Sequence, residues 1–394
     1  MRQAIILAAG QSSRFWPLNS RHKSLIKIMG KSLIWWTVYG LRKSGVRDII
    51  LVQTQDREIE KELKDKKIKY IIQPKPRGMG EAVWLAKNFI KGSFMVLNAE
   101  RVDINEIIES ARLKTHNPDI KSVLIGQKTK NTRLFGIMKL KGDKVLEIIE
   151  KPGKKAPSDI RTVGVYFLEP GFFKYYSKTK KHKYDFEKTL SFYMKNNEVR
   201  VHLLDKKEEA VSLKHPWQLF SVVKYLFDKN LGKKEIRLGK KVNIFKGAVI
   251  KGPCYIGDNC TVGNNAIIRD YTDLEEGATV GALAEVTRSI LQRNAHVHSG
   301  YFGDSVFGEG CRVGAGTITA NRRLDRDEIK VRIKKEKVAT GLSFLGTIAG
   351  DNTRIGINVS LMPGALIGPG SVIWPGSLVF GQDENYKTRL KKSR

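Results

Sequence analysis

A repeat of six residues runs through the C-terminal part of the chain. An apolar residue followed by Gly recurs at this step, as in Ile256-Gly257, Val262-Gly263 and Val280-Gly281, and it returns at Ile355-Gly356 and Ile367-Gly368. A period of six is neither the 3.6 of a helix nor the 2 of a strand. It predicts a triangular coil whose apolar residues fill the interior while each Gly turns a corner. Roughly 140 residues at about 18 per coil predict a stack of seven or eight coils. The alternative is a chance run of Gly-punctuated strands.

The six-residue repeat is interrupted between His296 and Asp325, and side chains that can take part in catalysis lie inside this interruption. The repeat shifts phase at Phe307-Gly308. An excursion over residues 320–347 then departs from the repeat, which resumes after it. An imidazole such as that of His298 titrates near neutrality and can accept a proton in catalysis. A His in a repeat protein is, taken alone, more often a polar surface residue. The residues around His298 in the sequence are therefore needed to choose between these two interpretations.

Residues 1–229 show a different pattern, in which short apolar strands alternate with amphipathic helices. We expect strands at Ala4–Ala9, Asp48–Gln53, Lys69–Gln73 and Ser93–Asn98, and helices from Ser32, from Arg57, at Gly80–Phe89 and at His215–Lys229. Such alternation predicts a Rossmann-like α/β domain with a mostly parallel sheet and ligands at the carboxyl ends of its strands. Residues 230–241 read as a basic linker, 242–382 as the repeat domain and 383–394 as a charged tail.

Composition narrows the class of protein. The chain has 394 residues, a length that is enough for two or three domains, and 41% of them are hydrophobic. The opening MRQAIILAAG reads as a strand and not as a signal peptide, and no apolar run is long enough to span a membrane. Three Cys residues form no even framework, which favours a reducing cytoplasm. The net charge of +31 permits loose association with polyanions, but no RNA-binding module or aromatic stacking platform accompanies it.

The segment LAAGQSSR, together with Lys23 in RHKSLIKIMGKSLI, resembles the phosphate-binding loop of sugar-1-phosphate nucleotidyltransferases. EKP at 150–152 and TVGVY at 162–166 resemble that family's sugar-contacting segments. The resemblance implies two sets of site residues. The nucleotide set is Ala8, Ala9, Gly10, Arg14, Lys23, Gln73 and Gly78, and the sugar set is Gly136, Glu150, Lys151 and Thr162.

Two departures from that family fall on its metal ligands. The family has Gly-Asp after the strand at Ser93–Asn98, where this chain has Ala99-Glu100, and a second Asp where this chain has Ser212. Magnesium requires hard oxygen ligands in nearly octahedral geometry, and Glu100 is the one acidic residue left at these positions. Asp103 is close in sequence, but it can equally be the cap of a helix at Ile104–Ala111. The sequence therefore predicts weak or lost nucleotidyl transfer.

The disturbed stretch carries a second resemblance. HSGYFGD at 298–304, GAGT at 314–317 and Asn321 resemble the acetyltransferase half of the glucosamine-1-phosphate acetyltransferase/uridylyltransferase family, particularly its archaeal members, and the resemblance covers nearly the whole chain. It implies a left-handed β-helix, acetyl-CoA as the acetyl donor and an amino-sugar 1-phosphate as the acceptor. It also implies site roles. His298 is the general base and Glu285 an acidic residue near it, while Arg269, Tyr301, Asn321 and Lys330 hold the sugar phosphate or the sugar. The family's phosphate-binding Lys is Thr287 here, and Arg288 is no automatic substitute, because adjacent strand residues point to opposite faces.

Three hypotheses remain open at this point. The chain is an acetyltransferase with a weak or inactive nucleotidyltransferase half, a fully bifunctional enzyme that also uses a nucleoside triphosphate and Mg²⁺, or a binding protein like the translation-initiation exchange-factor subunits that join these two folds. We expect a homotrimer in which the 320–347 excursion completes the site of a neighbouring subunit. The sugar epimer, the nucleotide base and the reason for the excess charge stay open.

Overall fold

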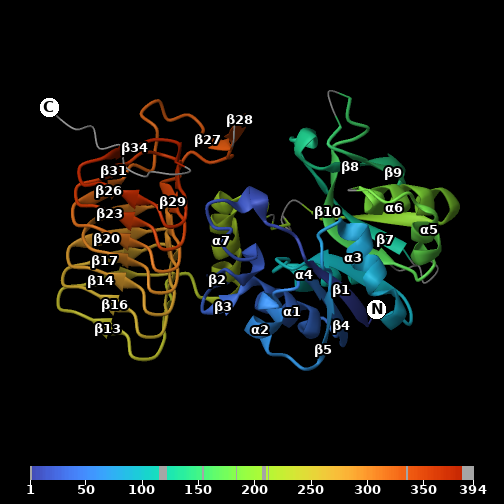
Figure 1. The fold of residues 1–394 in the computed structure, drawn as a ribbon, viewed down its shortest axis with the longest axis horizontal. Helices are drawn as coiled ribbons and strands as arrows, with labels where there is room; N and C mark the ends of the chain where they lie inside the picture. Colours follow the sequence, from blue (N-terminus) through green and yellow to red (C-terminus); the bar gives the residue numbers. More distant parts are fainter. Residues whose placement is uncertain are drawn as a thin grey trace. The chain divides into compact units, whose positions relative to one another are not determined.

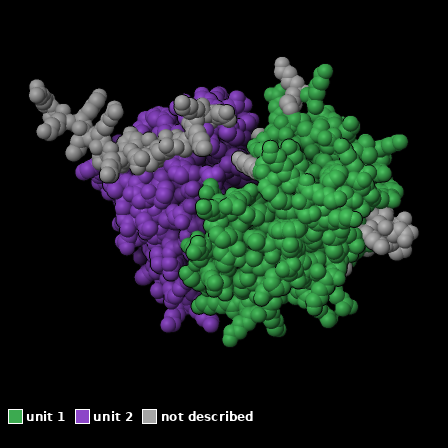
Figure 2. Space-filling model, turned by 45° about the vertical axis from the view of Figure 1, so that its right-hand side comes forward, with its two compact units in different colours: residues 1–11, 33–212 green, residues 12–32, 213–394 purple. Residues whose placement is uncertain are grey.

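The computed structural model describes residues 2–114, 122–152, 155–182, 184–205, 210–211, 213–333 and 336–383. The chain divides into two compact units, residues 1–11 with 33–212 and residues 12–32 with 213–394 (Figure 2). Segment 12–32 thus belongs with the C-terminal unit, although the sequence places it inside the 1–229 domain. Nearly all of the predicted charged tail, residues 384–394, lies outside the described ranges, and no helix within them is long and apolar enough to cross a membrane.

The first unit contains a nine-stranded sheet with the strand order β5-β4-β1-β6-β10-β7-β11-β9-β8 (Figure 1). Its strands are β1 (Gln3–Ala8), β4 (Asp48–Gln53), β5 (Ile68–Ile72), β6 (Phe94–Asn98), β7 (Ser122–Lys128), β8 (Gly136–Lys141), β9 (Lys144–Glu150), β10 (Ile160–Leu168) and β11 (Val199–Leu203). The run β5-β4-β1-β6 is parallel, as expected, and β10 is antiparallel to both β6 and β7. The sheet is therefore parallel in its first half and mixed in its second.

Helices connect these strands. They are α1 (Leu33–Lys43), α2 (Glu58–Leu63), α3 (Met79–Leu85), α4 (Ile104–Lys114), α5 (Phe172–Lys178) and α6 (Asp185–Asn196), with short 3₁₀ turns at Lys87–Phe89 and Thr132–Leu134. The parallel strands β1, β4 and β6 are buried over most of their length, as strands covered on both faces must be. Because these strands are parallel, their carboxyl ends lie at one edge of the sheet, where Ala8 and Asn98 are found.

The second unit is a parallel β-helix whose coils stack in Figure 1 from β13 to β34. One sheet contains β12 (Ile236–Leu238), β15 (Cys254–Ile256), β18 (Thr272–Leu274), β21 (Ile290–Leu291), β24 (Val306–Phe307), β29 (Thr347–Ala349), β32 (Ala365–Ile367) and β35 (Gln382–Asp383). A second contains β13 (Asn243–Ile244), β16 (Thr261–Val262), β19 (Thr279–Val280), β22 (His296–Val297), β25 (Arg312–Val313), β30 (Arg354–Ile355) and β33 (Val372–Ile373). The third contains β14 (Val249–Lys251), β17 (Ile267–Arg269), β20 (Ala284–Thr287), β23 (Gly300–Gly303), β26 (Thr317–Thr319), β31 (Ser360–Leu361) and β34 (Leu378–Val379). Strand β12 lies inside the predicted 230–241 linker and already pairs with β15.

The six-residue repeat predicts which apolar side chains fill the interior of this stack. Ile256, Val262 and Ile268 fill one coil with no exposed surface. Register partners are 18 residues apart in the regular coils, as Ile267 and Glu285 are, but only 16 apart at Glu285 and Tyr301. The coils are shorter there, and Phe302 and Phe307 pack edge to face in the interior with ring centroids 5.6 Å apart. The phase shift in the sequence thus reflects shortened coils filled by two large side chains.

The three outer faces of the β-helix differ in what their outward side chains present. On the first, the covered face, which is the β12–β35 sheet, the outward ladder of Ile290, Val306, Ile348 and Leu366 is fully buried. On the second, the polar face, which is the β13–β33 sheet, register stacks His296, Arg312 and Arg354. On the third, the site face, which is the β14–β34 sheet, the ladder runs through Val249, Ile267, Glu285, Tyr301, Ile318, Ser360 and Leu378. Four members of this last ladder are exposed apolar side chains, namely Val249, Ile267, Ile318 and Leu378.

The excursion over residues 320–347 forms a hairpin of β27 (Lys330–Ile333) and β28 (Glu336–Ala339). Ile329 and Val331 are buried, and they lie against Gly364, a residue of a later coil of the same chain. A Cβ atom added at Gly364 would lie 2.8 Å from Ile329 Cγ2. The base of the excursion therefore packs on its own β-helix.

Segment 12–32 packs in the second unit together with helix α7 (Leu219–Asn230) and the 3₁₀ turn at Pro216–Gln218. It contains two more 3₁₀ turns, Ser13–Phe15 and Lys23–Leu25, and the small hairpin of β2 (Lys27–Ile28) and β3 (Lys31–Ser32). Lys27 and Gln292 exchange two hydrogen bonds, from Lys27 N to Gln292 Oε1 at 3.3 Å and from Gln292 Nε2 to Lys27 O at 2.9 Å. These bonds tie the hairpin to the coil that begins with β21.

Candidate functional site

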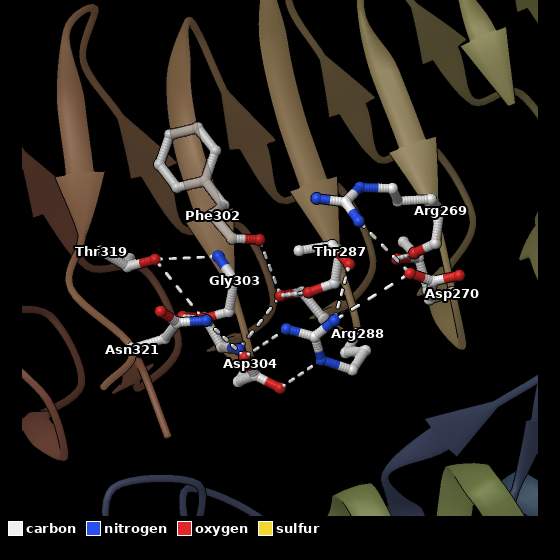
Figure 3. A network of polar contacts seen from close by, with 12 residues as sticks. Arg269, Asp270, Thr287, Arg288, Phe302, Gly303, Asp304, Thr319 and Asn321 are labelled. Atoms are coloured by element: carbon white, nitrogen blue, oxygen red, sulfur yellow. Dashed lines mark hydrogen bonds and ion pairs between the residues drawn. The ribbon is translucent and has the colours of Figure 1, made fainter. Parts of the chain in front are cut away.

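A network of charged and polar side chains lies at the strand ends of the site face (Figure 3). Strands β17 and β20 place Arg269 beside Glu285, and the Arg269 Nε donates to Glu285 Oε1 at 3.0 Å. Arg269 Nη1 also lies 3.5 Å from Asp270 Oδ2, and the hydrogen bond to Glu285 raises the pKa of the arginine. Arg269 and Glu285, both predicted to bind substrate, are therefore brought together.

Arg288 joins the same network. It follows strand β20 with φ 47°, a left-handed conformation that ends the strand's alternation. Its Nε and Nη2 donate to the two carboxylate oxygens of Asp304 at 2.7 and 2.9 Å. Thr287, at the expected Lys position, is fully buried, and its hydroxyl accepts from Arg288 Nη1 at 3.3 Å. The alternation of a regular strand ends at Thr287, so it does not exclude Arg288.

Tyr301 and Asn321 complete the network from the next two coils. Asn321 Nδ2 donates to Asp304 Oδ2 at 2.6 Å (Figure 3). It also donates to the Tyr301 hydroxyl at 3.3 Å. Tyr301 is the register neighbour of Glu285. Asn321 thus contacts residues of its own chain, although the sequence predicts that it belongs to an arm that reaches a neighbouring subunit.

His298 lies at the corner between the polar face and the site face, after β22 and before β23, and its side chain is exposed. Its backbone N donates to Val313 O at 3.0 Å, and its carbonyl lies where a Cβ atom on Gly281 would clash. Gly281 therefore permits the close stacking of this corner. The imidazole rings of His296 and His298 are nearly parallel with centroids 6.2 Å apart, and burial, Arg312 and His298 lower the pKa of His296.

Lys330 is exposed on strand β27 of the excursion. Among the described residues, no hydrogen bond or ion pair joins Lys330 or the His298 side chain to the network. The same excursion places Phe344 under two guanidinium groups, with Arg322 4.8 Å and Arg288 5.9 Å from the ring centroid. The structure thus brings four of the six predicted acetyl-transfer residues into one network. Of the other two, His298 lies at the adjoining corner of the β-helix and Lys330 on the β27–β28 hairpin.

The predicted nucleotide residues fall in both compact units. In the first unit Ala8 ends β1, Ala9 and Gly10 follow it, and Gln73 follows β5. The Gln73 amide donates to Gly78 O at 3.2 Å and to Glu81 Oε2 at 2.8 Å. In the second unit Lys23 Nζ donates to Leu213 O at 2.7 Å. Burial, followed by Arg14, lowers the pKa of His215 to about 4.

The predicted sugar residues all lie in the first unit. Gly136 pairs with Glu150 across β8 and β9, and a Cβ atom at Gly136 would lie 2.5 Å from Glu150 Oε1. Lys151 follows with φ 48°, and its backbone N donates to Phe135 O at 3.1 Å. Thr162 lies on β10, where the pairing with β7 shifts register.

The strand end expected to bind metal contains a fixed cation. Arg101, directly after the buried Glu100, is buried and donates to Val163 O at 3.0 Å and to Val211 O. Its Nε lies 3.0 Å from Asp103 Oδ1. Asp103 accepts from Val211 N at 2.8 Å, and burial raises its pKa.

This set of groups does not fit Mg²⁺. Asp103 is already committed to Arg101 and Val211, and a guanidinium occupies the space between the end of β6, strand β10 and residue 211. Ser212 lies outside the described residues. No cluster of three or more His, Cys, Asp or Glu side chains able to hold a metal ion occurs in the described ranges.

Sequence reasoning missed Arg101, Asp304 as a network member, and the contribution of Arg288. Asp304 stands within the quoted HSGYFGD motif, so the motif contained the signal. The rule for regular strands makes Arg288 no automatic substitute for the Lys, and a positive φ at a non-glycine residue cannot be read from its identity. Arg101 follows the altered Ala99-Glu100 pair, and a basic residue beside a weakened metal site is itself a signal.

Comparison with known proteins agrees with the fold. The family model for nucleotidyl transferases matches residues 3–219, and the model for bacterial transferase hexapeptide repeats matches residues 235–270 and 346–381. The hexapeptide match thus skips the disturbed coils and the excursion, where the polar network lies apart from Arg269 and Asp270. A putative glucose-1-phosphate thymidylyltransferase from Bacillus anthracis has a similar fold, with a TM-score of 0.50 and 20% identity over 59% of this chain and 98% of its own.

Relatives at higher identity align over nearly the whole chain. The bifunctional sugar-1-phosphate nucleotidylyltransferase/acetyltransferase of Sulfurisphaera tokodaii is 33% identical over 93% of this chain and 94% of its own length. The bifunctional protein GlmU of Methanocaldococcus jannaschii is 32% identical over 93% of this chain and 91% of its own. The two folds, their order along the chain and these relatives lead to one conclusion: this chain belongs to the family of bifunctional sugar-1-phosphate nucleotidylyltransferase/acetyltransferases.

Proposed function

We propose that the β-helix unit transfers an acetyl group from acetyl-CoA to the amine of an amino-sugar 1-phosphate of the glucosamine-1-phosphate type. The observation that carries this proposal is the network of Arg269, Glu285, Arg288, Asp304 and Asn321 beside Tyr301 on one face, with His298 at its corner. Guanidinium groups bind phosphate with charge-assisted hydrogen bonds. Tyr301, Asn321 and Glu285 supply the neutral and acidic groups that sugar hydroxyls and an amine require.

The reaction is an acyl transfer to nitrogen. The amine attacks the thioester carbonyl, His298 accepts the proton that the nitrogen loses, and the C–S bond breaks as the new C–N bond forms. Coenzyme A leaves as the thiolate, which takes up a proton. On the adjoining polar face, His296, Arg312 and Arg354 follow one another in register, and the two arginines provide cationic groups for the phosphates of acetyl-CoA. Lys330 completes the sugar-phosphate site from the hairpin.

We propose further that nucleotidyl transfer by the first unit is weak or absent. The name of the Sulfurisphaera tokodaii relative describes both activities, and that of the Methanocaldococcus jannaschii relative calls it bifunctional, so a fully bifunctional enzyme is the competing proposal. Arg101 favours the weaker activity, because its cation and Asp103 occupy the strand end where a metal would have to be held. Efficient transfer of a nucleotidyl group needs a cation that can move with the phosphates, and a guanidinium fixed by two carbonyl oxygens cannot do so.

The active form in this proposal is a homotrimer. The covered face is closed by the unit's own chain, whereas the site face has a ladder of four exposed apolar side chains next to Glu285 and Tyr301. Exposed apolar ladders of this kind mark surfaces that bind protein. A second copy packed on the site face would also bring its own groups to the network, in closed threefold symmetry.

Two assays on one purified protein test these proposals. CoA release from acetyl-CoA should depend on glucosamine 1-phosphate, and pyrophosphate release from a nucleoside triphosphate and the acetylated sugar phosphate should be slower by at least about tenfold at millimolar Mg²⁺. Pyrophosphate release as fast as CoA release would support the fully bifunctional alternative. Absence of both reactions across a panel of amino-sugar phosphates and nucleotides would favour a binding protein.

A further inference from the structure

Two carboxyl groups are buried on the covered face of the β-helix. Asp273 lies on β18 and Glu275 follows two residues later, so their side chains point to the same side. Asp273 is 0% and Glu275 is 1% exposed. The next members of the same outward ladder are Ile290, Val306 and Ile348, all fully buried. Two ionisable groups therefore lie in a surface that is otherwise apolar and closed.

The carboxyl pair contacts the tip of the β2–β3 hairpin. Met29 N donates to Asp273 Oδ1 at 3.1 Å, and Gly30 N donates to Glu275 Oε1 at 2.9 Å. Both tip residues have positive φ, 55° at Met29 and 73° at Gly30, which turns their two amides toward the pair. The other oxygens, Asp273 Oδ2 and Glu275 Oε2, are buried without a hydrogen-bond partner in the described structure.

The surroundings do not neutralise two negative charges. Within the described ranges, neither carboxyl forms an ion pair. The titratable and charged groups that act on the pair are Cys254, Tyr255 and Cys260 of the preceding coil, Glu276 beside it, and Lys27 of the hairpin. Only Lys27 among them is cationic. Burial and then the neighbouring Glu275 raise the pKa of Asp273, and burial raises the pKa of Glu275 to about 7. Two adjacent buried carboxylates cannot both ionise at low cost, so one proton stays with the pair.

We propose that Asp273 and Glu275 form a proton-dependent latch. It holds the hairpin tip against the β-helix while the pair shares a proton, and it releases the tip when that proton is lost. In the protonated state, one oxygen of each carboxyl accepts a backbone amide and the two remaining oxygens share the proton. In the fully ionised state, two like charges would remain in an apolar face, and opening of the tip would return them to water.

The latch acts on a segment that has its own chemistry. Segment 12–32 carries Arg14 and Lys23, the cations predicted to bind the nucleotide, and the hairpin is the part of this segment that the pair holds. Loss of the proton would loosen the support of these two cations. The inference depends only on the docked hairpin, so it stands or falls independently of acetyl transfer.

The sign of the pH dependence follows from the raised pKa values. An exposed Asp or Glu has a pKa near 4, and docking raises it, so the docked state binds more protons than the open state. Docking is therefore strongest below the ordinary pKa, weakens as pH rises from there to the raised value, and changes no further above it. For one linked proton, the opening equilibrium increases by up to about tenfold per pH unit in that window.

Hydrogen–deuterium exchange of the full-length protein tests the latch. Peptides that cover residues 26–32 are followed between pH 5 and 8, and each rate is divided by the intrinsic rate at that pH. We expect protection of the wild-type tip to fall by at least tenfold across this range. The double variant Asp273→Asn/Glu275→Gln should show a flat profile, and Glu276→Gln, which alters an exposed carboxylate next to the pair, should follow the wild type.

Three outcomes would overturn the inference. The first is a wild-type tip whose protection does not change with pH, and the second is the same fall in the wild type and the double variant. The third is protection that follows added Na⁺, Ca²⁺ or chelator instead of pH, which would mean that the pair holds a cation. If the double variant does not fold, Asp273→Asn alone decides, because its amide can donate to ionised Glu275 and should flatten the profile.

Discussion

At the scale of single residues, the ion pair of Arg288 with Asp304 joins two neighbouring coils and supplies the network with a cation that the Lys position lacks. We predict that Arg288→Ala raises the KM for glucosamine 1-phosphate by about 10–100-fold, the effect of losing one charge-assisted contact. The KM for glucosamine without the phosphate should stay the same, as should the KM for acetyl-CoA. Steady-state CoA release with the two acceptors measures both values.

The matched control is Arg293→Ala, which removes a similar but exposed pair with Glu309 in the same β-helix. It should change neither KM. If Arg288→Ala weakens both acceptors equally, then the residue maintains the shape of the site and does not bind phosphate.

Arg101 offers a second residue-scale prediction, this one about stability. Its removal leaves Asp103 buried without its cation and two carbonyl oxygens without their donor. We expect Arg101→Ala to lower the free energy of unfolding of the first unit by about 3 kcal/mol. Arg200→Ala, which removes an exposed pair with Asp143, should change it little. Urea denaturation followed by Trp fluorescence provides the comparison, and equal small losses in both variants would contradict a structural cation.

The same residues show the limit of reading side chains one at a time. His298, Tyr301, Asn321 and Glu285 were predicted from motif and spacing, and the last three do lie together on one face, whereas their roles stay predictions. The outcome at Arg288 depended on a left-handed backbone conformation at the end of a strand. Nothing in the identity of an Arg residue signals that conformation.

At the scale of elements, the packing of the 320–347 excursion can be tested at two glycines. Gly364 and Gly370 both have positive φ, 75° and 68°, so replacing either with Ala introduces similar backbone strain. Only Gly364 faces the hairpin, through Ile329, Val331 and Leu345, whereas nothing lies within 4 Å of a Cβ atom at Gly370. We predict that Gly364→Ala, but not Gly370→Ala, exposes the hairpin to trypsin and reduces CoA release several-fold.

Equal proteolysis of the two glycine variants would contradict the packing of the excursion on its own coils. The excursion itself was predicted from the break in the repeat, but its fold was not. Ile329, Val331 and Ile333 alternate with Lys330 and Arg332, which is the period of a strand, and this signal was hidden within a highly charged stretch. The regular coils were predictable because each hexad buries one apolar residue, whatever the rest of the chain does.

At the scale of the whole molecule, the asymmetry of the three outer faces predicts the assembly. We expect Leu378→Asp, on the exposed apolar ladder of the site face, to convert a trimer into monomers at micromolar concentration. Leu324→Asp changes a fully exposed Leu on the excursion and should leave the trimer intact. Light scattering gives the mass, and a wild-type monomer would contradict the trimer directly.

A shared site is a separate question from the trimer. Mixing inactive His298→Ala with inactive Lys330→Ala subunits should restore part of the activity if hairpin and base come from different chains. No recovery in properly mixed trimers would place the whole site in one chain. Asn321 already contacts Tyr301 and Asp304 of its own chain, so any sharing must come from Lys330 and the outer part of the hairpin.

Large-scale features were predictable to different degrees. The two folds and their order along the chain were predicted correctly because hydrophobic periodicity and long motifs specify them. The antiparallel placement of β10 between β6 and β7 was not, since the apolar pattern of a buried strand carries no direction. The packing of segment 12–32 with the β-helix includes hydrogen bonds to two acidic residues far away in sequence, Asp273 and Glu275.

The central claim is acetyl transfer with His298 as general base, and one comparison tests it most directly. CoA release with saturating acetyl-CoA and glucosamine 1-phosphate is measured at neutral pH for His298→Ala and for His296→Ala, whose ring lies parallel to that of His298. We predict that His298→Ala lowers kcat by about 10²–10⁴-fold, while His296→Ala retains kcat within a few-fold. Wild-type turnover in His298→Ala would contradict the assignment of His298 as the base.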